Sequence, residues 1–177
     1  GWFSEMPAEG AHAAWWFTAG IRRTAIDDDV TPGAIRALLA LFEVTGDAKV
    51  VWEPNRHHHL VVLGRAYRAF GDPRYAAAAL RQIASWIDDN PFGYGMNWRS
   101  PLELGIRVIN WVWALDLVRD REDRPRGFDE RIRETVWRHL REITGKYSRG
   151  SSANNHLIGE AAGVFIGSAY FPDLTEA

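Results

Sequence analysis

The segment SPLELGIRVINWVW, residues 100–113, contains the pattern that decides the fold. A serine followed by a proline is a common helix start, because serine caps the helix and proline fits its first turn. Glu103 stands at the third helical position, as in a capping box. Apolar residues then recur at helical spacing and leave little polar face. The segment therefore predicts a largely buried helix that ends at about residue 119.

Helical periodicity extends over most of the chain, whereas the alternating β-branched runs of strands are almost missing. We expect Asn55 to cap one helix, and the sequence Gly71-Asp72-Pro73 to end that helix and begin another. Besides the helix above, helices are predicted at residues 31–44, 56–70, 73–89, 129–147 and 154–170. Helical hairpins repeated at irregular intervals are typical of a solenoid or an (α/α) toroid. The fold class is therefore all-α, with repeated αα-hairpins forming part of an incomplete (α/α) toroid.

Two parts of the chain are distinguished by this pattern. Residues 1–47 form an N-terminal lead-in with one helix, and residues 48–177 form the partial toroid. The more apolar helices, at 56–70, 101–118 and 154–170, are expected to form its inner ring. Because the last of them lacks a return helix, we expect the chain to be truncated at its C-terminus and to be the first part of a larger domain.

Composition excludes several classes of protein. The 177 residues are 46% hydrophobic and 25% charged, include no cysteine and carry a net charge of −2. There can be no disulfide scaffold or thiolate chemistry, and there is no basic footprint for nucleic acid or for a membrane surface. No apolar run is long enough to span a bilayer, and no signal peptide is visible. All but two of the 21 basic residues are arginine, which either reflects genome composition or serves to recognise carboxylate and sulfate groups.

Three polar, aromatic segments stand at the starts of the inner helices. They are residues 52–59, 97–103 and 151–156. Parallel inner helices place their N-terminal ends on one side, so we expect the three segments to converge on one mouth. Helix N-termini present unpaired N–H groups, which favour an anionic ligand.

The first segment contains three consecutive histidines, residues 57–59. Consecutive helical positions point about 100° apart, so these imidazoles cannot share one metal ion. We therefore predict no metal site here, and expect Arg56 or His57 to face the mouth.

The other two segments offer further candidates. Trp98 could stack on a sugar while Arg99 pairs with an acidic group, or the two could be a packing plug and an exposed charge. Asn154 and Asn155 precede His156, and a second amide beside a histidine needs a partner when it enters an apolar helix. One turn later, Glu160 could hold His156 in place.

These segments together resemble the heparinase II/III-like polysaccharide lyases. The resemblance covers roughly residues 48–172, and its most specific part is NNHLIGEAAG, residues 154–163. Its other parts are WEPNRH at 52–57 with Leu60, GRAY at 64–67, Gly71-Asp72, Asn90-Pro91, Asn97-Trp98, Glu103, Ile106-Arg107 and Asn110-Trp111.

The resemblance implies an N-terminal (α/α) toroid, a following C-terminal β-sandwich domain and β-elimination at uronic-acid-containing polysaccharides such as heparan sulfate or alginate. In this reaction the carboxylate must be neutralised before a base can remove the C5 proton. By the family's motif, Asn155 neutralises the carboxylate, and His156 assists it or acts as the base. The substrate-binding candidates are Asn154, Arg56, His57, Asn97, Trp98 and Arg99.

The resemblance has further implications. The catalytic tyrosine and a second histidine lie later in the sequence of family members, so we expect no activity from this piece alone. The zinc that some members carry also belongs to the later part, so we expect no cofactor here. It also implies a periplasmic or secreted protein.

Two other functions remain open. One is a non-catalytic acidic-glycan-binding or scaffold toroid from an exopolysaccharide cluster. The other is an (α/α) glycoside hydrolase that uses Glu103 and Glu160 as paired carboxylates, in which the Asn-Asn-His segment would have no role.

Overall fold

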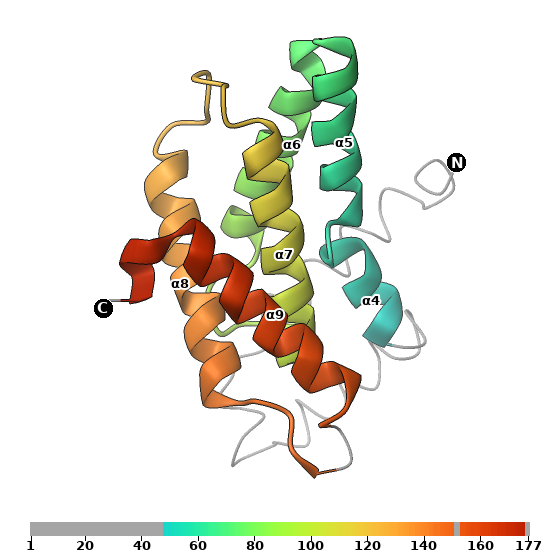
Figure 1. Cartoon of the computed structure of the whole chain (residues 1–177), viewed down its shortest axis with the longest axis vertical. Helices are drawn as coiled ribbons and strands as arrows, with labels where there is room; N and C mark the ends of the chain where they lie inside the picture. The colour runs from blue at the N-terminus through green and yellow to red at the C-terminus, as the bar shows by residue number, and fades with distance from the viewer. Residues whose placement is uncertain (1–47, 151–152, 176–177) are drawn as a thin grey trace.

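A computed structural model of the chain describes residues 48–150 and 153–175 (Figure 1). All regular structure in this part of the chain is helical, which confirms the expected all-α class. The elements are α4 (Ala48–Asn55), α5 (His58–Phe70), α6 (Pro73–Asp89), the 3-10 turn η1 (Met96–Trp98), α7 (Pro101–Leu117), α8 (Phe128–Gly145), α9 (Asn155–Tyr170) and the 3-10 turn η3 (Pro172–Thr175). The helix predicted at residues 31–44 and the rest of the lead-in lie outside the described residues. Within the described ranges, no helix is both long and apolar enough to cross a membrane.

The helices form antiparallel neighbours around α7. As Figure 1 shows, α5 runs upward, α6 returns, α7 runs upward again and α8 returns. Helix α9 then crosses in front of α7 and α8 and packs against both. Helix α7 also contacts α5 and α6, so it is the central element of the fold.

The core lies between α6, α7 and α8. Its large aromatic members are Trp86, Trp98 and Trp111, which are all at most 5% exposed. Their rings are neighbours: the Trp86 centroid lies 5.8 Å from that of Trp98 and 5.2 Å from that of Trp111. Aliphatic side chains of the same helices complete this core, among them Leu80, Ile83, Leu104, Val108, Leu115, Ile132, Val136 and Ile143.

Two helices begin where they were predicted to begin, one with and one without a side-chain cap. Helix α6 begins at Pro73 because the Asp72 side chain accepts a hydrogen bond from the backbone N–H of Arg74, at 2.9 Å. Helix α7 begins at Pro101 as predicted, but the capping box is wrong. Ser100 makes no side-chain cap, and Glu103 turns instead toward an arginine of the α4–α5 junction.

The start of α5 also differs from the prediction. Asn55 does not cap it, because residues 48–55 are themselves helical and Asn55 ends α4. The chain turns at His57, whose φ of 63° lies in the left-handed region, and α5 begins one residue later. A β-carbon is strained in that region, so tertiary contacts of His57 must hold it there.

Candidate functional site

The three polar segments lie at the starts of α5, α7 and α9. These helices all run upward in Figure 1; α7 and α9 start near the lower end of the molecule, whereas α5 starts higher, beside the end of α4. The starts of α7 and α9 touch, since a Cβ on Gly159 would lie 2.6 Å from Leu102 Cδ1. On the other side, an ion pair joins Arg56 to Glu103 in the first turn of α7. The first turn of α7 therefore contacts both Arg56 of the first segment and Gly159, which follows the third segment in α9.

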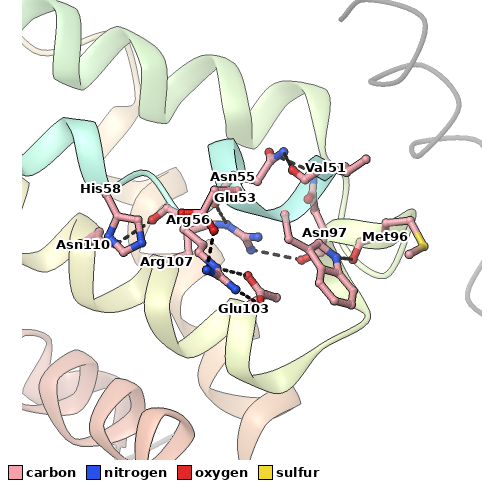
Figure 2. Close-up of polar contacts among 11 residues, drawn as sticks. Val51, Glu53, Asn55, Arg56, His58, Met96, Asn97, Glu103, Arg107 and Asn110 are labelled. Atoms are coloured by element: carbon pink, nitrogen blue, oxygen red, sulfur yellow. Dashed lines mark hydrogen bonds and ion pairs between the residues drawn. The ribbon is translucent and has the colours of Figure 1, made fainter. Parts of the chain in front are cut away.

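Arg56 is bound on one edge by a buried carboxylate. Its Nε donates to Glu103 Oε2 at 2.8 Å and its Nη2 to Glu103 Oε1 at 2.9 Å (Figure 2). Its Nη1 donates to Glu53 Oε2 at 2.5 Å. The Glu103 side chain is 3% exposed, against 23% for Arg56 and 62% for Glu53. The hydrogen bond to Glu103 raises the pKa of Arg56, so the guanidinium stays charged.

A cluster of buried amides lies behind this ion pair. Asn55 Oδ1 accepts hydrogen bonds from Trp86 Nε1 at 2.7 Å and from Asn97 Nδ2 at 3.1 Å. Asn97 Nδ2 also donates to Asn90 Oδ1 at 2.8 Å, and the backbone oxygen of Asn90 accepts from Trp98 Nε1 at 3.1 Å. The cluster fixes the loop before α7 against the end of α4.

Arg107 lies at the centre of the same cluster and is fully buried. Its Nε donates to the backbone oxygen of Asn55 at 2.7 Å, and its Nη1 donates to that of Asn97 at 3.2 Å (Figure 2). Its guanidinium carbon lies 4.2 Å from the centroid of the Trp86 ring, a cation–π contact. Burial lowers the pKa of Arg107 to about 9, although the negative charge of Glu103 opposes this shift.

The tautomer of His139 follows from its partners. Its Nδ1 lies 2.7 Å from the carbonyl oxygen of Thr135, which can only accept, so Nδ1 carries the proton. Its Nε2 therefore accepts from Arg107 Nη1 at 3.1 Å. Burial, and then the charge of Arg107, hold the pKa of His139 well below its ordinary value, so this histidine is neutral.

The three consecutive histidines contact three different side chains, two of them on α7 and one on α6. His57 Nδ1 accepts from Trp111 Nε1 at 2.7 Å, His58 Nδ1 lies 3.1 Å from Asn110 Nδ2, and His59 Nε2 lies 2.8 Å from Gln82 Oε1. In the described part of the chain, no group of three histidine, cysteine or acidic side chains is arranged to hold a metal ion.

His57 belongs to the core, contrary to the expectation that it faces the mouth. It is 5% exposed, its ring stacks on that of Trp111 with centroids 6.0 Å apart, and burial holds its pKa well below the ordinary value. Of the two residues expected at the mouth, Arg56 alone has a partly exposed side chain.

Asn97 and Trp98 are likewise internal. They are 2% and 5% exposed, and the Trp98 ring lies against those of His139 and Phe92, at centroid distances of 4.4 and 5.1 Å. The packing alternative therefore holds for Trp98, and as placed neither residue has surface with which to touch a polysaccharide. Arg99 is exposed at the end of η1.

The start of α9 presents Asn154, Asn155 and His156 at the surface. Within the described ranges, no hydrogen bond engages their side chains. Residues three and four apart share a helix face, so Asn155 lies in line with the exposed Ile158, whereas His156 lies in line with the buried Glu160. The two candidate catalytic side chains thus leave α9 from neighbouring faces.

Glu160 does not hold His156, contrary to one expectation. It is fully buried, and its two oxygens accept from the backbone N–H and the hydroxyl of Ser148, at 2.7 and 2.6 Å. It thereby anchors the connection between α8 and α9. Because Glu160 and Glu103 both use their two oxygens in internal bonds, the structure gives no support to a hydrolase with this carboxylate pair.

Two glycines, Gly105 and Gly163, set the position of α9 on α7. A Cβ on Gly163 would lie 2.5 Å from Gly105 Cα, and a Cβ on Gly105 would lie 2.8 Å from the backbone oxygen of Gly159. Real Cβ atoms do not approach backbone this closely, so the crossing requires glycine. This close approach carries the exposed start of α9 to the first turn of α7.

Sequence reasoning missed the residues that organise the site. Arg107, His139 and Asn110 had no assigned role, although an arginine and an asparagine inside an apolar helix were a usable signal, because buried polar groups need partners. Asn110 Nδ2 donates to the backbone oxygen of Arg56 at 2.8 Å and so helps to fix the α4–α5 junction (Figure 2).

Comparison with known proteins agrees with the pattern in these segments. The family model described as Heparinase II/III N-terminus matches residues 35–177. The chain belongs to this family. It is also 27% identical, over 151 residues, to a heparin-sulfate lyase of Bacteroides stercoris. That match covers 74% of this chain and 22% of the relative, so the chain spans about a fifth of the relative's length. No solved structure matches the chain significantly.

Proposed function

We propose that this chain is the helical, substrate-contacting part of a polysaccharide lyase that cleaves uronic-acid-containing acidic polysaccharides, of the heparan sulfate or alginate kind, by β-elimination. The observation that carries the proposal is the pair Asn155 and His156, exposed side by side at the start of α9 in a chain of this family. The curated relative named a heparin-sulfate lyase supports the same class of reaction.

The chemistry explains why an amide and an imidazole would stand together. In the proposed reaction the Asn155 amide donates to the uronate carboxylate and so stabilises the negative charge that develops when C5 loses its proton. His156 assists this neutralisation or accepts the C5 proton. The electron pair of the C5–H bond forms the C4–C5 double bond, and the glycosidic oxygen leaves with a proton from an acid outside the described residues.

The rest of the proposal concerns the whole protein. We propose a β-sandwich domain as the partner of this helical domain, an acidic polysaccharide as its ligand, and a periplasmic or secreted location. The alternative is a glycan-binding or scaffold domain without catalysis.

The test is the ultraviolet absorbance of the unsaturated uronate that β-elimination creates. The complete protein is incubated with heparan sulfate and with alginate, and the Asn155→Ala and His156→Ala variants are compared with His59→Ala, a histidine change on the α6 side of α5. We expect product with the wild type and His59→Ala and a loss of at least about a hundredfold in the other two. Unchanged turnover in both would refute the assignment, and polysaccharide binding without product would favour the scaffold alternative.

A further inference from the structure

We propose that the outer edge of Arg56 binds a carboxylate or sulfate group of the acidic polysaccharide, and that Glu53 is a built-in competitor which the polysaccharide displaces. The inference rests on the proposed function, and it adds the group that this chain recognises and a residue that sets the affinity.

The first step concerns the donors of Arg56. A guanidinium has five N–H donors, and Arg56 uses Nε–H and one Nη2–H for Glu103 and one Nη1–H for Glu53. One N–H on each terminal nitrogen remains, and within the described residues neither has a partner. Release of Glu53 adds the second Nη1–H to these, and the guanidinium then offers parallel N–H groups on its two terminal nitrogens, which match the spacing of the oxygens in a carboxylate or a sulfate.

The second step concerns the two carboxylates, which Arg56 binds with unequal strength. Glu103 makes a two-point contact and is 3% exposed, whereas Glu53 makes a one-point contact and is 62% exposed. An exposed, one-point ion pair contributes little stability, because water and salt compete with it. An incoming anion therefore displaces Glu53 and leaves Glu103 in place.

The third step concerns the local charge. Glu103 faces Arg56 directly and also interacts electrostatically with the buried Arg107. Two arginines and two carboxylates balance while Glu53 is bound. Once Glu53 swings away, one positive charge is left uncompensated at the surface, and this charge favours an anionic group.

The last step concerns position. Arg56 is attached to the first turn of α7 through Glu103, and the start of α9 contacts that turn through Leu102 and Gly159. A polysaccharide that reaches Asn155 and His156 therefore passes beside the same helix end that holds Arg56. An anionic group on a neighbouring sugar is the natural occupant.

The test is binding of a heparan sulfate tetrasaccharide to the complete protein, measured by calorimetry, for Glu53→Gln, Arg56→Lys and the control Glu130→Gln. The control removes the same charge from an exposed glutamate in the first turn of α8, at the opposite end of the helices (Figure 1). We expect Glu53→Gln to lower the Kd about threefold. We expect Arg56→Lys to raise it about tenfold, and Glu130→Gln to leave it unchanged. A desulfated, carboxyl-reduced tetrasaccharide should not distinguish the variants.

The Glu53→Gln result decides the inference, because a purely structural role for Arg56 would not make binding tighter. A Kd equal to that of Glu130→Gln, or a higher one, would overturn the displacement of Glu53. An unchanged Kd in Arg56→Lys would overturn the anion site. Both results are independent of catalysis: if no acidic polysaccharide yields an unsaturated product, the proposed lyase function fails while tighter binding by Glu53→Gln still supports the site.

Discussion

The crossing of α9 over α7 gives the sharpest test of the packing. In Gly163→Ala the new Cβ would lie 2.5 Å from Gly105 Cα and 2.9 Å from its backbone oxygen. Ordinary contact begins near 3.4 Å, so the two backbones must separate by roughly 1 Å, an overpacking change that destabilises by about 1–3 kcal/mol. The better helix propensity of alanine offsets up to about 1 kcal/mol of this.

Two other helical glycines serve as controls. A Cβ on Gly159 would meet only the end of the flexible Leu102 side chain, and a Cβ on Gly145 would meet nothing within 4 Å. The free energy of unfolding, measured in urea by circular dichroism, should therefore fall by about 1–2 kcal/mol in Gly163→Ala, fall less in Gly159→Ala and stay level or rise in Gly145→Ala. If Gly163→Ala proved as stable as Gly145→Ala, the close crossing described above would be incorrect.

Two further predictions concern the charged groups. His57 and His139 have pKa values held well below 6.5 in the folded protein, so only the unfolded chain takes up these protons as the pH falls. We therefore expect the free energy of unfolding to decrease below about pH 6.5, by up to about 2.7 kcal/mol per pH unit for the two histidines together. In a His139→Gln variant the pH dependence of the urea midpoint should be about half as steep. Removal of Arg56 leaves Glu103 buried without its ion pair. Arg56→Met should therefore lower the free energy of unfolding by about 3 kcal/mol. The double variant Arg56→Met/Glu103→Gln should recover part of this loss in the same urea assay. If Arg56→Met and the double variant had equal stability, the interpretation of the ion pair would be contradicted. A urea midpoint that does not change with pH would contradict the interpretation of the two histidines.

Local sequence signals predicted most of the helices well. The start of α6 at Pro73 and that of α7 at Pro101 depend on residues next to each other in the chain, and both were expected at those positions. Helix α4 was not expected, because a short helix with Pro54 in its last turn has little periodicity to detect.

Contacts between distant residues account for what the sequence left undecided. The pairing of Arg56 with Glu103 spans 47 positions, and no local rule favours it over the capping box that was predicted for Glu103. For Trp98, the sequence left a sugar platform and a packing plug equally open, and the ring of His139, which lies on another helix, decides between them. The exposed Asn155 and His156 could be named in advance because the family motif is contiguous there.

The bonds of Arg107 have a consequence for how this array folds. In an ideal helical repeat each hairpin touches only its neighbours, so hairpins can unfold one at a time. Here one guanidinium joins Asn55 before the first hairpin, Asn97 between the two hairpins and His139 in the second. Loss of any one of these segments leaves a charge or a carbonyl group buried without its partner, which is strongly unfavourable. Residues 55–139 are therefore expected to unfold as one cooperative unit, and a cut between the hairpins would destabilise both halves.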